Sequence, residues 1–86
     1  MFPIISLPSN FNLNDARNGL YYTTSSAIVA TLVNKPDNWP KGEISVLSVH
    51  NNYGAFQVAI QTNYDSMSLK KRTYSDYIGW STWTSV

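Results

Sequence analysis

Two of the chain's three tryptophans, Trp80 and Trp83, stand close together in residues 79–86, a stretch without a charged side chain. A buried aromatic side chain removes roughly 150–250 Å² from water, so a stretch with two indoles is expected to pack against the rest of the chain. Residues 13–22 combine a turn-forming motif with Tyr21 and Tyr22. We therefore expect a small domain in which the first and last strands meet.

The chain is short and lacks cysteine. A domain of 86 residues buries only roughly 60–65% of the surface that its unfolded chain exposes, so the expected core is small. Neither a disulfide nor a thiolate-bound metal can supplement that core, because the sequence contains no cysteine. The remaining common aid for a small fold is association with copies of itself or with a larger chain.

Charged side chains are sparse and nearly balanced, with six Lys and Arg against five Asp and Glu. Nucleic-acid binding needs a clustered basic surface. The one basic run, residues 70–72, stands in a predicted strand whose successive side chains point to opposite faces. The apolar N-terminal residues lack a basic segment, and no stretch is long enough to span a membrane. We therefore expect neither a nucleic-acid partner nor membrane insertion.

Residues 1–11 are expected to form an extended lead-in or linker, and residues 12–86 a single domain. Pro3 and Pro8 favour the extended lead-in, because proline fixes its own φ and pushes the preceding residue out of the helical region.

A single helical turn is expected where the domain begins. Asn12 or Asn14 offers an N-cap, residues 15–18 make the turn, and Gly19 supplies a left-handed stop.

The rest of the chain predicts β structure, because its periodic segments are rich in β-branched and aromatic residues. Residues 51–54 have turn chemistry and join two strands into a hairpin, in which Phe56, Val58 and Ile60 share one face. Val49 falls out of phase and predicts a bulge. The expected fold is mainly β, a small antiparallel sheet or sandwich with one short N-terminal helical turn. Strands are expected at residues 20–24, 28–33, 43–50, 55–62, 67–74 and 80–86.

Catalytic and metal-binding patterns are missing from the sequence. His50 is the only histidine, and a surface position at the end of a strand is its expected role. Asp15 is expected at a helix start and Asp37, Asp65 and Asp76 in turns, which disfavours a carboxylate pair for glycoside hydrolysis. One histidine and no cysteine give no cluster of metal ligands. We expect neither an enzyme nor a cofactor.

Aromatic and amide side chains carry most of the remaining chemistry. Sugars stack their apolar faces on Tyr and Trp and pair their hydroxyls with Asn, Gln, Ser and Thr, so this composition suits a polysaccharide-binding surface. Arg72 is expected either to donate bidentate hydrogen bonds across strands or between subunits, or to lie on a solvated face. Core positions are expected for Tyr21, Tyr22, Trp80 and Trp83. The candidate ligand-binding residues, which fall in loops or turns where loop packing is the alternative, are Trp39, Tyr53, Tyr64 and Tyr77.

An ordered set of residues over positions 12–86 carries a family resemblance. It comprises Leu13-Asn14-Asp15, Gly19 with Tyr21-Tyr22, the loop at residues 40–42, a strand ending in Val49, the strand of Gln61, Arg72, and Trp80-Ser81-Thr82-Trp83. In this order the residues resemble the pyocin knob type domain of bacteriophage tail fibres and tail spikes. Thr84 departs from the basic residue that such domains often carry, and residues 25–34 form a longer segment than usual.

The resemblance implies a non-enzymatic virion module near the distal end of a phage tail fibre or tail spike. It also implies a homotrimer that contacts other tail fibre or baseplate domains and helps to recognise bacterial surface polysaccharide. The alternative is a structural module that caps, trimerises or attaches the fibre and has no ligand of its own. An enzyme that acts on glycans through His50 or a carboxylate is disfavoured. The residues that match the family pattern are expected to be framework positions, namely Asn14, Gly19, Tyr21, Arg72, Trp80 and Trp83.

Overall fold

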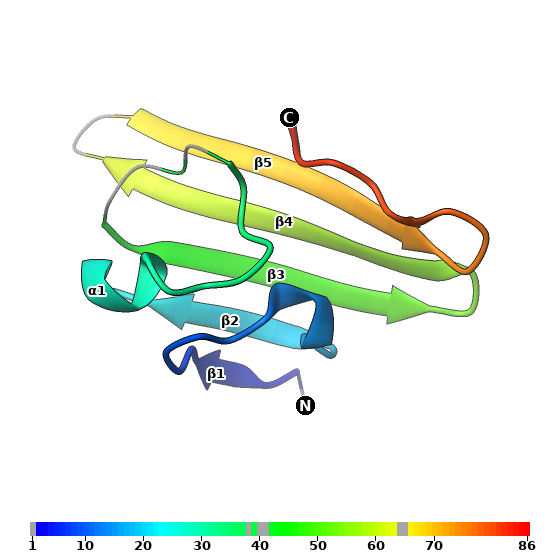
Figure 1. Cartoon of the computed structure of the whole chain (residues 1–86), viewed down its shortest axis with the longest axis horizontal. Helices are drawn as coiled ribbons and strands as arrows, with labels where there is room; N and C mark the ends of the chain where they lie inside the picture. Colours follow the sequence, from blue (N-terminus) through cyan, green and yellow to red (C-terminus); the bar gives the residue numbers. More distant parts are fainter. Residues whose placement is uncertain (1, 38, 40–41, 64–65) are drawn as a thin grey trace.

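A computed structural model of the chain describes residues 2–37, 39, 42–63 and 66–86, and it is mainly β (Figure 1). The strands form one sheet in the order β1-β2-β3-β4-β5-β6, and β7 also pairs with β5. β1 and β2 are parallel, and the other pairs are antiparallel. The predicted class is confirmed, as a single sheet in the described residues. The strands are β1 (Ile4–Ser6), β2 (Gly19–Thr23), β3 (Ile44–Asn51), β4 (Gly54–Asn63), β5 (Ser66–Ser75), β6 (Gly79–Trp80) and β7 (Thr84–Ser85).

The hairpin between β3 and β4 forms where the sequence predicts it. Asn51 Oδ1 accepts hydrogen bonds from the backbone N–H groups of Tyr53, at 2.8 Å, and of Gly54, at 3.0 Å. Such side-chain to backbone bonds are the reason that Asn favours turns. The expected bulge is wrong, because Val49 pairs with Phe56 in a register that runs without interruption along the hairpin.

The two faces of the sheet differ in how they are covered. On β4, Gln57 and Ala59 have no exposed surface, whereas Phe56 on the opposite face is 37% exposed. Tyr22, expected in the core, also lies on that opposite face and is 39% exposed. We call this face the open face, because its side chains are half-buried or exposed. Its apolar residues are Ile4, Leu20, Tyr22, Leu47, Val49, Phe56, Val58, Ile60, Met67 and Leu69.

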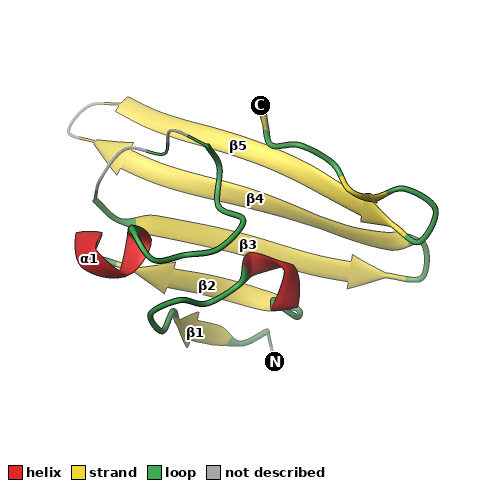
Figure 2. Cartoon of the chain, viewed as in Figure 1, coloured by secondary structure: helices red, strands yellow, loops and turns green. Residues whose placement is uncertain are grey.

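An irregular layer, which we call the cover, lies over the other face and builds the core with it (Figure 2). The cover contains a 3-10 turn, η1 (Leu13–Asp15), a short helix, α1 (Ser26–Val29), and loops. Asn12 Oδ1 links two parts of the cover, because it accepts hydrogen bonds from Asn14 N–H at 2.9 Å and from Asn34 Nδ2 at 2.8 Å. The core residues are Leu7, Leu13, Ala16, Tyr21, Val29, Leu32, Trp39, Ile44, Val46 and Ala59.

Local structure in the cover departs from the sequence predictions. The strand expected at residues 28–33 is wrong: α1 begins after Ser25, whose Oγ accepts a hydrogen bond from Ile28 N–H at 3.3 Å as an N-cap. The helical turn expected at residues 15–18 is instead η1, which starts earlier and carries one of the two predicted caps, Asn12. No helix in the described ranges combines the length and the apolar character that a membrane crossing requires.

The N-terminal residues expected as a lead-in or linker join the sheet through β1, and residues 9 and 10 form a turn. Leu20 N–H donates a hydrogen bond to Pro3 O at 2.9 Å, and Leu7 is only 2% exposed. Gly19 begins β2 and does not end a helix. A Cβ at Gly19 would stand 3.1 Å from Pro3 O, so this glycine permits the close approach of β1.

The first and last strands do not meet, because β6 and β7 pair with β5, whereas β2 lies between β1 and β3. The single strand expected at residues 80–86 is two short strands, β6 and β7, separated by residues 81–83. Ser81 N–H donates a hydrogen bond to Thr73 O at 2.8 Å. The C-terminal segment instead reaches the cover, where Trp83 Nε1 donates a hydrogen bond to Asn34 O at 2.9 Å. This contact closes one side of a groove.

Candidate functional site

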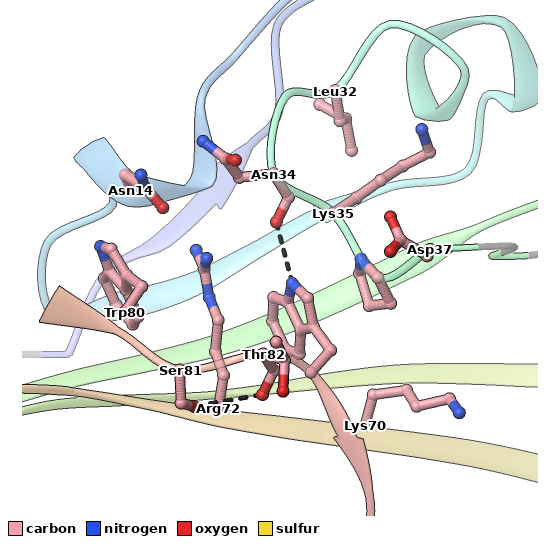
Figure 3. Close-up of a pocket in the computed structure, with 12 residues that line it drawn as sticks. Asn14, Leu32, Asn34, Lys35, Asp37, Lys70, Arg72, Trp80, Ser81 and Thr82 are labelled. Carbon is pink, nitrogen blue, oxygen red and sulfur yellow. Dashed lines mark hydrogen bonds between the residues drawn. The ribbon is translucent and has the colours of Figure 1, made fainter. Parts of the chain in front are cut away.

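A groove of about 480 Å³ opens between the cover and the C-terminal segment, next to β5 (Figure 3). We call it the Arg72 groove. From the cover, η1 contributes Asn14, and the loop after α1 contributes Leu32 and residues 34–37. The other lining residues are Lys70, Arg72, Trp80, Ser81, Thr82 and Trp83.

Arg72 lies at the base of the groove. The register of β4 and β5 places Arg72 directly opposite Gln57 on the covered face, and Arg72 is 5% exposed. Its Nε and Nη2 atoms both donate hydrogen bonds to Gln57 Oε1, at 3.0 and 2.8 Å. The predicted hydrogen bonding of Arg72 across strands is therefore confirmed.

Gln57 connects the guanidinium to the cover. Its side chain has no exposed surface, and its Nε2 atom donates to Leu13 O at 2.7 Å and to Ser48 Oγ at 3.4 Å. The Gln57 amide therefore accepts hydrogen bonds from the guanidinium and donates one to the backbone of η1. Gln57 is neutral, so it supplies hydrogen bonds without neutralising the positive charge.

Trp80 and Trp83 hold the guanidinium between them. The Cζ atom of Arg72 lies 3.9 Å from the ring centroid of Trp80 and 4.7 Å from that of Trp83. Cation–π contacts of this kind stabilise by about 0.5–2 kcal/mol, most when they are desolvated. Tyr74 packs against Trp80, with ring centroids 5.2 Å apart. Both tryptophans are half-buried at the groove. Trp83 also packs against the core, as expected, whereas Trp80 does not belong to it.

Positive charge dominates the electrostatics of the groove. Burial lowers the pKa of Arg72 to about 10, because desolvation disfavours the charged form. The guanidinium is still protonated at neutral pH. Lys70 lies on the same face of β5 and donates through Nζ to Ser85 Oγ at 3.0 Å. Lys35 and Asp37 approach from the cover, so the lining combines three cationic side chains with one carboxylate.

The aromatic residues predicted to contact a ligand do not form one surface in the described part of the chain, because Trp39 lies in the core and Tyr53 and Tyr77 lie in exposed turns. Tyr53 and Tyr77 are 92% and 100% exposed, in the turns after β3 and β5 at the same end of the sheet (Figure 1). Trp39 is only 8% exposed and belongs to the core, so its ring is not open to a ligand and its candidate role is corrected. Tyr64 lies outside the described residues. For Tyr53 and Tyr77, ligand contact stays a prediction.

The residues predicted as framework positions lie at the groove or in β2. Gly19 and Tyr21 are in β2, where the Tyr21 hydroxyl accepts a hydrogen bond from Arg17 N–H at 2.7 Å. The other four line the groove, namely Asn14, Arg72, Trp80 and Trp83.

Sequence reasoning missed Gln57, Asn34 and Lys35 as parts of this site. Gln57 had no usable signal, because its alternation with large apolar residues predicts that it lies on the solvent-facing side of the hairpin. Asn34 and Lys35 come from a loop far away in sequence, and no local pattern marks them.

His50 lies beside a second hollow, of about 300 Å³, between β3 and the segment after η1. Its Nε2 atom is 2.8 Å from Ala16 O, and its backbone N–H donates to Asn18 Oδ1. This exposed position near the end of β3 agrees with the expected role of His50. Among the residues that the structure describes, no group of three or more His, Cys, Asp or Glu is placed to hold a metal ion.

Comparisons of this chain with family models, with curated proteins and with solved structures find no match.

Proposed function

We propose that this chain is a non-enzymatic virion module of a phage tail fibre or tail spike, and that it helps to recognise the host by binding surface glycan in the Arg72 groove. The observation that carries the proposal is the groove itself, in which two indoles, a buried guanidinium and several amide and hydroxyl groups share one hollow. The resemblance to the pyocin knob type domain supports the virion setting.

The groove offers a saccharide polar groups and the apolar edges of Trp80 and Trp83, whose ring faces hold Arg72. Sugar rings stack their apolar faces on aromatic rings, and their hydroxyls pair with amide and hydroxyl groups. Asn14 and Thr82 are exposed at the groove. Neither side chain has a hydrogen-bond partner in the described part of the chain, so both are available to ligand hydroxyls.

The lining of the groove favours binding over hydrolysis. Most glycoside hydrolases use two carboxyl groups that flank the scissile bond. Asp37 is the one carboxylate among the lining residues, and His50 lies at the second hollow. This arrangement supports a role without turnover.

Removing two polar groups from the groove is expected to weaken glycan binding. The double variant N14A/T82A loses two hydrogen bonds of about 0.5–1.5 kcal/mol each, so the Kd should rise by about tenfold. The measurement is a titration of the whole chain with capsular polysaccharides and O-chains from a bacterial panel, followed by tryptophan fluorescence.

The matched control is Y53A/Y77A, which removes two exposed side chains at the end of the sheet and should leave the Kd unchanged. Loss of binding in Y53A/Y77A alone would place the site at that end. A wild-type chain that binds none of the glycans would contradict the proposal.

The open face favours a second candidate function, a structural module that trimerises, caps or attaches the fibre. β4 and β5 each have ten residues. At about 3.3 Å per residue and about 4.8 Å between strands, β1 to β5 span a face of roughly 600 Å². Stable interfaces bury about 800 Å² per partner. Three copies with their open faces turned towards a common axis would therefore cover an apolar surface of a suitable size.

A charge in the middle of the open face is expected to dissociate such a trimer. Leu47 pairs with Leu20 and Val58, so the L47E variant places a carboxylate among the apolar side chains of this face. We expect sedimentation equilibrium to report a trimer for the wild type and a monomer for L47E. N52E adds the same charge at the exposed turn after β3 and should remain trimeric. A wild-type monomer at high concentration would count against this candidate.

A further inference from the structure

The Arg72 groove concentrates the positive charge of the chain. The whole sequence has six cationic and five acidic side chains, with a formal net charge of +1. The groove is lined by Lys35, Lys70 and Arg72, with Asp37 as the one carboxylate. Figure 3 shows the ammonium ends of Lys35 and Lys70 directed away from Arg72, and Lys70 Nζ donates to Ser85 Oγ. The two lysines therefore raise the positive potential around the hollow, and the guanidinium of Arg72 lies at its base.

The guanidinium of Arg72 presents an unused end to the groove. It has five N–H donors, and Gln57 Oε1 accepts from Nε and Nη2. No other hydrogen bond to this guanidinium occurs among the described residues, which leaves the donors at the Nη1 and Nη2 end. Figure 3 shows that end directed away from β5, towards Asn14 and Asn34. Two parallel donors of this kind match the two oxygens of a carboxylate.

The unused end is in contact with the space of the groove. Trp39 Nε1 is the one fully enclosed side-chain nitrogen or oxygen without a partner in the described ranges. The Nη1 atom of Arg72 is therefore not sealed inside the protein. Trp80 and Trp83 cover the two faces of the guanidinium, so its end is the direction left for a ligand.

Burial of the Arg72 guanidinium favours an anionic ligand over a neutral one at this position. Desolvation lowers the pKa of Arg72 to about 10, which reflects a charge that lacks a compensating carboxylate. A hydrogen bond between charged groups is roughly twice as strong as one between neutral groups. Sugar hydroxyls cannot supply that stronger interaction.

We infer that the glycan bound in the Arg72 groove is acidic, and that one of its carboxylates lies end-on against the Nη1 and Nη2 atoms of Arg72, with Lys35 and Lys70 adding to its attraction. This inference rests on the proposed function and names its ligand class, a polysaccharide with uronic or sialic acid units. The ring next to the carboxylate then meets the indole edges and the polar groups of the groove.

The test compares acidic oligosaccharides with their carboxyl-reduced forms. Fragments of alginate, polygalacturonate, hyaluronate and polysialic acid are titrated, each in both forms, into the ¹⁵N-labelled whole chain. The indole N–H signals of Trp80 and Trp83 report binding at the groove, and Trp39 in the core serves as the internal reference. For at least one polymer, the acidic form should bind about tenfold or more tightly than its reduced form at low salt, and added salt should narrow the difference.

Two neighbouring lysines provide matched variants. Lys70 lines the groove, whereas Lys71 points to the open face. Because Arg72 is buried, replacing it would test folding as well as binding, so the variants are K70Q and K71Q. We expect the K70Q substitution to raise the Kd for the acidic ligand about threefold or more, because it removes one charge from the site. The K71Q substitution should leave this Kd unchanged.

Each outcome decides the inference. Equal affinity for the acidic and reduced forms would overturn it and leave glycan binding intact. Equal losses of affinity in K70Q and K71Q would also overturn the inference, because the attraction would then depend on the net charge of the chain and not on the position of the charge in the groove. Absence of binding by every form would remove both the inference and the proposed function.

Discussion

Replacing Gln57 with leucine is expected to lower the free energy of unfolding by about 3–5 kcal/mol, because the buried guanidinium of Arg72 loses its acceptor and keeps its charge. The Q57L variant also removes the amide that donates to Leu13 O in the cover. Small domains have a total stability of only about 5–15 kcal/mol. Urea unfolding followed by tryptophan fluorescence should therefore show a midpoint far below that of the wild type.

The double variant Q57L/R72M distinguishes the cost of an unpaired buried charge from the cost of lost packing. It removes the guanidinium together with its acceptor, and methionine can occupy the space between Trp80 and Trp83. The double variant should be more stable than Q57L, because an apolar replacement of both partners leaves no unpaired buried charge. Identical midpoints for Q57L and the double variant would contradict the role assigned to the buried charge.

Replacing Gly54 with alanine is expected to destabilise the chain by about 3 kcal/mol or more, through steric overlap and an unfavourable backbone conformation. Gly54 has a φ of +157°, and an added Cβ would overlap the backbone oxygen of Tyr74. That oxygen belongs to β5, whose pairing with Ala55 fixes its position. The overlap can be relieved only by separating β4 from β5 at this end. Urea unfolding of G54A measures the loss.

Gly79 supplies the control for this prediction. It also has a positive φ, of +81°, but a Cβ at Gly79 would meet no atom within 4 Å. The G79A variant should therefore lose only the conformational term, about 1–2 kcal/mol. If G54A and G79A are destabilised equally, the overlap with Tyr74 does not determine the cost.

Local chemistry made part of the fold predictable. The hairpin of β3 and β4 follows from strand alternation and from Asn51, whose side chain forms the turn within three residues of itself. The basic run also divides as expected, with Lys70 and Arg72 on one face and Lys71 on the other. These features depend on neighbours in sequence, so sequence patterns could identify them.

Which face of the sheet is covered could not be predicted from the pattern alone. The alternation on β4 shows that Phe56 and Val58 share one face and Gln57 and Ala59 the other, yet it is the latter face that is buried. Burial there depends on a cover whose contacts reach across the chain, such as the hydrogen bond from Gln57 to Leu13 over 44 positions. Hydrophobicity alone would have favoured the other face.

The residues at the centre of the candidate site could be predicted from the sequence, and those at its edges could not. Hydrogen bonding of Arg72 across strands and packing of the C-terminal indoles follow from residue chemistry. The position of Lys35 depends on a loop that the C-terminal segment fixes, through the contact of Trp83 with Asn34. That contact joins residues 49 positions apart, and nothing local in the sequence indicates it.

The separation between Asn34 and Trp83 has a consequence for biosynthesis. During translation, the β3–β4–β5 meander can assemble from hairpins as soon as its own residues leave the ribosome, because each hairpin pairs adjacent strands. The indoles that enclose Arg72 emerge later, since Trp80 and Trp83 follow β5. Until then the nascent chain carries a guanidinium shielded by Gln57 alone. The groove therefore forms only after the C-terminal segment has packed against the cover.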